Sequence, residues 1–267
     1  VGVLPQDAAM RDAMATQDCL FTLVLRHPDG SLEPRIVGSA LEYLFAPDDP
    51  EAVRRRLMDP SVRIVSLTVT EGGYLKNPAT GVFDSAHPSA VHDLAHPEMP
   101  QTAFAYIVEG LRRRREAGME PFTVLSCDNL QGNGIFARQA VVGFARLVDE
   151  DLAQWIDENV PFPNCMVDRI TPATTDADRA AVLAQFGYED AWPVPGELFT
   201  QWIVEDEFPN RSTLLQLDRR QFLTLMGSSL ALAGMGAGCR FLPEEKIVPY
   251  VTMPEELVPG KPLVYAS

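Results

Sequence analysis

The chain has 267 residues, of which 46% are hydrophobic and 22% are charged, a composition typical of a globular protein that buries a core. Its 22 Lys and Arg residues are outnumbered by 37 Asp and Glu residues, so the formal net charge is −15. Because such a surface repels polyanions, we expect no nucleic-acid partner.

The first part of the chain predicts a strand end, a helix and a hairpin. The opening VGVLPQDAAM is typical of a buried strand that runs into a loop and then a helix around residues 8–15. It carries no signal-peptide pattern, and its abrupt start leads us to expect residues before Val1. Two apolar runs then flank Pro28-Asp29-Gly30, a turn tripeptide in which glycine adopts positive φ at little cost.

Two further strands are predicted, each followed by a helix. Residues 64–69 are β-branched or apolar without clean alternation, as expected for a strand covered on both faces. Helical spacing follows over 101–117 and includes the arginines at 112–115, which we expect to face solvent near the helix C-terminus. FTVLSCDN predicts the second strand, and a long helix is expected over 133–159. This alternation predicts a parallel sheet with right-handed crossovers.

Small and polar residues follow the two predicted strands. Ligands of parallel sheets bind beyond the carboxyl ends of the strands. We therefore expect a ligand near Glu71, Gly72, Gly73, Asp128 and Asn129. Later in the chain, FPNCMVDRITP follows the long helix and LFTQWIVEDEF predicts another strand.

The spacing Gly132-x-Gly134-x-x-Ala137 formally matches a dinucleotide-binding fingerprint. A true fingerprint needs an acidic residue that closes a second strand about 20 residues later. Here the following residues stay helical as far as Asp149 and Asp151. We therefore interpret Gly132 and Gly134 as turn and cap glycines.

The cysteines and histidines predict no metal site. The cysteines are scattered without a C-x-x-C pair, which favours reduced, buried thiols over a disulfide framework or a zinc site. Their positions are Cys19, Cys127, Cys165 and Cys239. His87, His92 and His96 lie close together, but the prolines between and after them predict a loop without a fixed helical face.

Four sequence motifs follow one another in the same order as in a known protein family. They are RIVSLTVTEGGY, FTVLSCDNLQGNG, FPNCMVDRITP and LFTQWIVEDEFP. They resemble the long-chain polyol dehydrogenase family, of the mannitol dehydrogenase and fructuronate reductase type, over residues 1–209. The resemblance implies an α/β fold, with a partial NAD-binding, Rossmann-like parallel sheet that is incomplete at its N-terminus. It also implies metal-independent hydride transfer (EC 1.1.1 type) between a polyol or sugar acid and its ketose, such as mannitol/fructose or mannonate/fructuronate.

The same resemblance assigns cofactor contacts. Asp7 matches the carboxylate that holds the adenosine ribose hydroxyls and favours NAD over NADP, since a carboxylate repels a 2′-phosphate. Gln6 stands where a further acid is often found, which would weaken that repulsion. Gly72 and Gly73 let the backbone approach the cofactor.

Three catalytic roles follow from the resemblance. Glu71 matches a glutamate that gates proton movement near the nicotinamide, and Asn129 matches one of two asparagines that polarise the substrate oxygen. Asp168 matches an aspartate that orients the catalytic region. For these side chains and Asp7 the alternative is an ordinary strand-end or helix cap.

The resemblance also implies a general-base lysine in a K-x-x-x-x-N-x-x-H motif, and neither Lys76, Lys246 nor Lys261 begins that spacing. The glycine-rich loop expected before Val1 is absent as well. We therefore expect a dehydrogenase fragment that is inactive alone, cytoplasmic and monomeric.

The end of the chain has a second resemblance. The stretch DRRQFLTLMGSSLALAGMGAGC, residues 218–239, is similar to a twin-arginine export signal. Residues 205–267 resemble the start of the iron-sulfur, molybdopterin-like subunit of the alternative quinol-oxidising respiratory complex. We expect a chimera that joins near 205–209, whose residues 210–267 form an irregular tail with one short apolar helix and no independent domain.

Membrane association is disfavoured because the 17 uncharged residues of 222–238 fall short of the ~20 that span a bilayer. The alternatives are a membrane-associated respiratory module, an exported protein, and a poorly folding product without function.

Overall fold

The structure is a computed structural model that describes residues 1–4, 7–77 and 81–208. Its elements in chain order are α1 Ala8–Thr16, β1 Phe21–Arg26, β2 Leu32–Val37, α2 Pro50–Leu57, β3 Ile64–Leu67, the 3-10 helix η2 Glu71–Tyr74, α3 Pro88–Ala95, α4 Ala103–Glu116, β4 Thr123–Ser126, α5 Asn133–Val148, α6 Glu150–Asn159, β5 Cys165–Asp168, α7 Asp176–Phe186, β6 Val194–Glu197 and β7 Gln201–Val204. The predictions for the twin-arginine-like segment and the tail lie outside the described residues.

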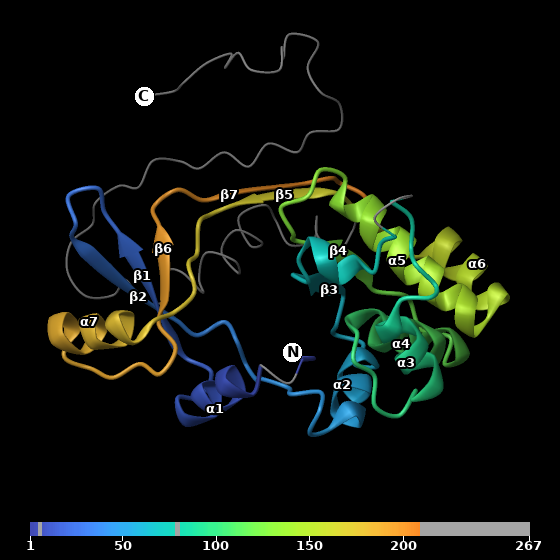
Figure 1. Ribbon diagram of the computed structural model, residues 1–267, viewed down its shortest axis with the longest axis horizontal. Coiled ribbons are helices and arrows are strands. Elements are labelled where there is room, and N and C mark those ends of the chain that lie inside the picture. The colour runs from blue at the N-terminus through green and yellow to red at the C-terminus, as the bar shows by residue number, and fades with distance from the viewer. Residues whose placement is uncertain (5–6, 78–80, 209–267) are drawn as a thin grey trace, which may run out of the picture.

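The elements gather in two groups (Figure 1). The smaller group contains α1, β1, β2, β6 and α7, and the larger contains β3, β4 and helices α2 to α6. The antiparallel pair β5–β7, with Cys165 opposite Val204 and Asp168 opposite Gln201, lies between them. Two strands of opposite direction therefore connect the groups.

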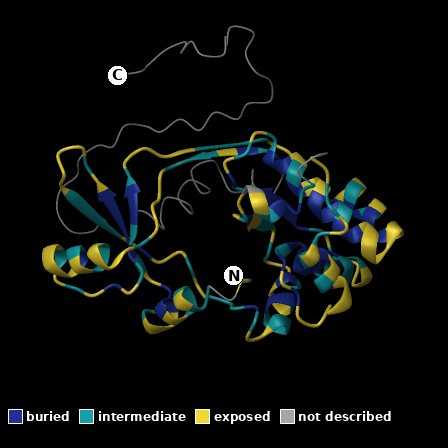
Figure 2. Ribbon diagram, in the orientation of Figure 1, coloured by how far each residue is buried: buried dark blue, intermediate teal, exposed yellow. Residues whose placement is uncertain are grey.

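The larger group confirms the predicted parallel strands. Ile64 of β3 lies opposite Thr123 of β4, and Leu67 lies opposite Ser126. Helix α4 connects the two strands in sequence. The core that these elements share is formed by large side chains that are nearly inaccessible to water (Figure 2), among them Phe104, Ile107, Leu111, Phe122, Val124, Val141 and Ile156.

The smaller group contains the predicted hairpin. Strands β1 and β2 are antiparallel, and Gly30 in the turn adopts φ +84°. On its other edge β1 pairs in parallel with β6, where Leu23 lies opposite Val194. The carboxylate of Asp190 accepts a hydrogen bond from the Thr22 amide at 2.5 Å, so the chain before β6 is fixed to β1.

The long helix expected over 133–159 is two helices, so that prediction was wrong. Asp149 has extended backbone (φ −162°, ψ 125°) and separates α5 from α6. Its side chain accepts a hydrogen bond from the Leu152 amide at 2.7 Å and so caps α6. A helix N-cap prefers Asp, and here that preference outweighs the continuous helical pattern.

The expectation that all four arginines of 112–115 face solvent was also wrong. The Arg114 side chain is buried, and its guanidinium donates to the carbonyl oxygens of Leu57, Asp59, Val62 and Glu120 at 2.6–2.9 Å. A buried guanidinium needs such partners because an unpaired charge in the interior is costly. Arg114 therefore fastens α4 to the turn that precedes β3.

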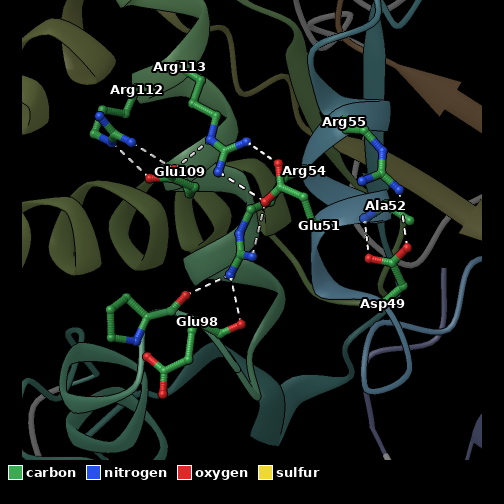
Figure 3. A network of polar contacts seen from close by, with 10 residues as sticks. Asp49, Glu51, Ala52, Arg54, Arg55, Glu98, Glu109, Arg112 and Arg113 are labelled. Carbon is green, nitrogen blue, oxygen red and sulfur yellow. Dashed lines mark hydrogen bonds and ion pairs between the residues drawn. The ribbon is translucent and has the colours of Figure 1, made fainter.

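Ion pairs join α2 to α4 (Figure 3). Arg113 of α4 donates to Glu51 of α2 at 2.6 Å and to Glu109 of its own helix at 2.7 Å. Arg54 of α2 is buried and donates to the carbonyl oxygens of Pro97 and Glu98 at 2.6 and 3.2 Å. Ion pairs, as well as apolar packing, therefore hold the exposed end of α4 in place.

The histidine segment is a helix rather than the expected loop. Pro88 occupies the first turn of α3, where a missing N–H costs nothing, and His87 Nδ1 accepts a hydrogen bond from the Ser89 amide at 3.2 Å. Within the described ranges, no three His, Cys, Asp or Glu residues are arranged to hold a metal ion. Likewise, none of the helices described has the length and apolar character to cross a membrane.

Candidate functional site

The carboxylate of Asp128, just after β4, holds the segment that follows β3. It accepts hydrogen bonds from the amides of Val69 and Thr70 at 3.1 and 2.9 Å and from the Tyr74 hydroxyl at 2.7 Å. Asp128 is only 8% exposed, which strengthens charge-assisted hydrogen bonds. Two neighbouring strand ends are therefore joined by one side chain.

The segment held by Asp128 has an unusual backbone. Thr70 and Leu75, which flank η2, have φ of +60° and +50°. Such conformations cost non-glycine residues about 1–3 kcal/mol each and persist only where the surroundings enforce them. Tyr74 supplies part of that enforcement, because its buried hydroxyl also contacts Ser126 Oγ at 2.5 Å. Burial, together with the Asp128 carboxylate, raises the pKa of Tyr74 above its ordinary value.

The predicted glycines of this segment differ in their surroundings. A Cβ atom on Gly73 would lie 2.9 Å from Val69 Cβ, so the local packing requires glycine there. A Cβ atom on Gly72 would meet no atom within 4 Å, so Gly72 opens onto free space. The backbone of Glu71 begins η2, and its side chain is outside what the structure describes.

A cavity of about 450 Å³ lies at the carboxyl end of β4. Residues 128–132 form one wall, and residues 164–166 with Ile203 and Glu205 form the other. Of the residues expected near a ligand, Asp128 and Asn129 line this cavity. The strand-end position expected for a ligand therefore coincides with a concave surface that carries a polar amide.

Asn133, which the sequence analysis did not identify, fixes the shape of this cavity. Its Nδ2 donates to the carbonyl oxygens of Ser126, Asp128 and Cys165 at 3.0, 3.0 and 2.7 Å, and its Oδ1 accepts from the Cys165 amide at 2.9 Å. The side chain is fully buried. Its only sequence signal is its place at the start of a helix after a strand, which does not reveal the carbonyl partners.

The interpretation of Gly132 as a cap glycine is confirmed, whereas Gly134 lies inside the first turn of α5, where close packing requires glycine. Gly132 adopts φ +73° at the start of α5, and a Cβ atom on Gly134 would lie 2.3 Å from the carbonyl oxygen of Phe162. The Gly134 amide donates to Asn164 Oδ1 at 3.0 Å, and Asn164 Nδ2 donates to Glu205 at 2.9 Å. Helix α5 thus starts in direct contact with the chain that enters β5.

Asp7 lies on another part of the molecule, directly before α1. Its Oδ2 accepts a hydrogen bond from the Leu4 amide at 2.9 Å, which orients the carboxylate. The nearby backbone is tightly packed, because a Cβ atom on Gly2 would lie 2.3 Å from Tyr43 Oη. An oriented carboxylate beside a strand end and a helix start fits a group that holds ribose hydroxyls.

Asp168 ends β5 and is half-buried opposite Gln201 of β7. It does not line the cavity at β4. The structure therefore brings the 69–74 segment to Asp128 and places Asn129 in the cavity, whereas Asp7 and Asp168 stand on separate elements.

The chain is similar in sequence to a known protein family and to characterised enzymes. The family model described as the mannitol dehydrogenase Rossmann domain matches residues 1–217. Mannitol 2-dehydrogenase of Neosartorya fischeri is 49% identical over 212 residues, which are 79% of this chain and 42% of that protein. The polyol:NADP oxidoreductase of Gluconobacter oxydans is 48% identical over 212 residues, 79% of this chain and 44% of that protein.

Among solved structures, the ternary complex of Pseudomonas fluorescens mannitol 2-dehydrogenase with NAD and D-mannitol is 46% identical, with a TM-score of 0.75. It covers 78% of this chain, which in turn covers 42% of that one. A substrate-free D-sorbitol dehydrogenase has a TM-score of 0.74 at 46% identity, with coverages of 77% and 43%.

Parallel strands with polar residues at their carboxyl ends, and these similarities, define a Rossmann-type domain of the kind found in polyol dehydrogenases. Within that class the chain belongs to the mannitol dehydrogenase family. It spans a little over two fifths of the length of the curated relatives given above.

The family match ends at residue 217, directly before the twin-arginine-like segment that begins at Asp218. Mannitol 2-dehydrogenase of Aspergillus terreus, 43% identical, aligns with 91% of this chain and so includes part of the later segment. The resemblance of residues 205–267 to a respiratory subunit stays a prediction.

Proposed function

We propose that this chain supplies the NAD-binding part of an enzyme that interconverts mannitol and fructose by hydride transfer. The observation that carries the proposal is Asn129 in the wall of the cavity at the end of β4. There the amide would donate a hydrogen bond to the substrate oxygen and stabilise charge that develops on it. The relative with NAD and D-mannitol bound supports this assignment.

Residues at the strand ends and before α1 would hold NAD. The oriented carboxylate of Asp7 would accept hydrogen bonds from the adenosine ribose hydroxyls, and the open side of Gly72 would allow close approach of the cofactor, whereas Gly73 is required for packing against Val69. When bound there, NAD would supply the acceptor for the hydride. We assign Glu71 to proton movement near the nicotinamide and Asp168 to orientation of the catalytic region, by similarity to the family.

Binding of NAD to the intact chain, measured by isothermal titration calorimetry, tests the proposal. Replacing Asp7 with Asn should weaken binding at least tenfold, because the neutral amide accepts the ribose protons less well. The control Asp12→Asn lies on the neighbouring exposed face of α1 and should bind NAD as the parent does. A folded chain that binds no NAD would refute the proposal.

NADP is the second candidate cofactor, because the Gluconobacter oxydans relative is named a polyol:NADP oxidoreductase. The Asp7 carboxylate would repel a 2′-phosphate, so we expect NAD to bind more tightly. Parallel titrations with NAD and NADP decide between them.

We propose that the chain alone is catalytically incomplete, because the lysine motif expected for proton transfer is not in its sequence. The substrate pair mannonate/fructuronate is the alternative to mannitol/fructose. NADH oxidation followed at 340 nm with fructose and with fructuronate tests both statements. Turnover of either ketose would contradict incompleteness and identify the substrate, and it would leave the NAD proposal intact.

We further propose a cytoplasmic monomer whose residues 210–267 come from a second gene. Light scattering after gel filtration measures the mass, and cell fractionation measures the location. Recovery with membranes would favour a respiratory module instead. Sequencing of single long DNA molecules across the codons of residues 205–217 distinguishes a natural fusion from an assembly error.

A further inference from the structure

Two cysteines from different strands meet beside the cavity. Cys165 begins β5, and its Sγ lies 2.8 Å from the carbonyl oxygen of Ser126, the residue bonded to Cys127. Asn133 binds the Cys165 backbone through both N–H and C=O and also binds the carbonyl oxygens of Ser126 and Asp128. The Cys127 amide donates to the Leu67 carbonyl at 2.8 Å, so both backbones are held in place.

The Cys165 sulfur lies against the backbone of the residue that precedes Cys127, and each thiol shifts the pKa of the other. The Cys127 thiol beside it lowers the pKa of Cys165 to about 7, and the Asn133 amide, 3.7 Å from the sulfur, adds to this effect. The same pairing, together with burial, raises the pKa of Cys127. Of the two sulfurs, Cys165 is therefore the one that ionises more easily to the thiolate, which is the reactive form.

Access from solvent differs between these sulfurs and the remaining described cysteine. Cys165 is buried from the outer surface but lines the cavity at the end of β4, which is the side from which a small oxidant would approach. Cys127 is half-buried. Cys19 is buried in the loop after α1 and does not line this cavity.

We propose that Cys127 and Cys165 are a redox-modification site that closes to a disulfide when the protein meets hydrogen peroxide. The Cys165 thiolate attacks one peroxide oxygen, so an S–O bond forms, the O–O bond breaks and, with one proton, water leaves. The Cys127 sulfur then attacks the Cys165 sulfur: the S–S bond forms, the S–O bond breaks, and the Cys127 proton leaves with a second water. Two thiols are oxidised and one peroxide is reduced to two waters.

The disulfide between Cys127 and Cys165 would lie beside the cavity that we propose as the substrate site. Cys127 precedes Asp128 and Asn129, and Cys165 forms the opposite wall of the same cavity. A disulfide would join the two walls covalently. A thiol reductant would open it again, which makes the modification reversible.

Peptide mapping of the intact chain tests the inference. The reduced protein is exposed to one equivalent of hydrogen peroxide, free thiols are alkylated, and a tryptic digest is analysed without reduction. Cleavage after arginine places Cys127 in residues 116–138 and Cys165 in residues 147–169, each with a single cysteine. We expect these two peptides joined, with a mass two hydrogen atoms below their sum, and separated by dithiothreitol.

Variants supply the controls. Cys127→Ser and Cys165→Ser should each abolish the joined peptide, whereas Cys19→Ser should leave its yield unchanged. In a Cys239→Ser background, peroxide should reduce the free-thiol count from three to one. Sulfinic acid at Cys165 without the joined peptide, or equal joining to Cys19, would overturn the inference. The mapping requires neither NAD nor activity, so its result is independent of the proposed function.

Discussion

Asp128 shows how much of the site depends on one side chain. Its carboxylate makes three hydrogen bonds to the 69–74 segment. Replacing it with Asn should lower the free energy of unfolding by about 2 kcal/mol, because bonds to a buried charged acceptor are worth about 1.5–3 kcal/mol each and an amide keeps part of them. Urea denaturation measures the change. The control Asp157→Asn, which breaks an exposed ion pair with Arg138, should change stability by less than about 1 kcal/mol.

Asn133 should be still less tolerant of substitution. Asn133→Leu keeps the volume but leaves the carbonyl oxygens of Ser126, Asp128 and Cys165 without this donor. We expect a loss of about 3 kcal/mol or more, since each buried unsatisfied group costs about 1–3 kcal/mol. Thermal unfolding followed by circular dichroism measures it. Asn159→Ala, at an exposed helix end, serves as the control, and equal losses would show that the three carbonyl bonds contribute little.

At the scale of elements, the contact between α2 and α4 should depend on pH. The Arg113 guanidinium holds the pKa of Glu51 below its ordinary value of 4.5. A lowered pKa in the folded state means that the stabilisation is present above pH 4.5 and is lost as the pH falls through the folded-state value. As the pH is lowered from 6 to 3, the midpoint of denaturation should therefore fall less steeply in Glu51→Gln than in the parent protein. Identical slopes would show that the pair does not contribute.

The start of α5 should tolerate only glycine at position 134. Gly134→Ala would place a Cβ atom 2.3 Å from the carbonyl oxygen of Phe162, and the backbone has little freedom to move. We expect a loss of about 1–3 kcal/mol, as for other overpacked sites, measured by urea denaturation. Gly72→Ala, whose Cβ atom would enter open space, should leave the stability nearly unchanged.

The local sequence pattern predicted most of the secondary-structure elements, but it did not predict the tertiary contacts between them. The hairpin at Gly30, the parallel pair β3–β4 and helix α4 follow from apolar periodicity and turn chemistry. The break at Asp149 and the burial of Arg114 do not, because a cap and a buried guanidinium are decided by tertiary contacts. The strand-end position of Asn129 was predictable, whereas the bonds that Asp128 and Asn133 make require the folded neighbours.

At the scale of the whole molecule, the two groups of elements should differ in local stability. The buried apolar cluster of the smaller group consists of Leu23, Leu25 and Val37, whereas the cluster of the larger group extends over α2 to α6. Segments with few buried apolar contacts open more often. Hydrogen exchange followed by mass spectrometry should therefore find faster exchange in β1 and β2 than in β4 and α5. Equal protection would show that the groups open together.

The pairing of β1 with β6 has a consequence for the order of events on the ribosome. Leu23 and Val194 lie opposite each other although 171 residues (194 − 23) separate them. At about 5–20 residues per second, β1 emerges roughly 10–35 s before its parallel neighbour is synthesised. During that interval the β1–β2 hairpin has an uncovered edge, which is a template for wrong pairing. The nascent chain should therefore be most prone to aggregate, and most in need of a chaperone, before residue 194 leaves the exit tunnel.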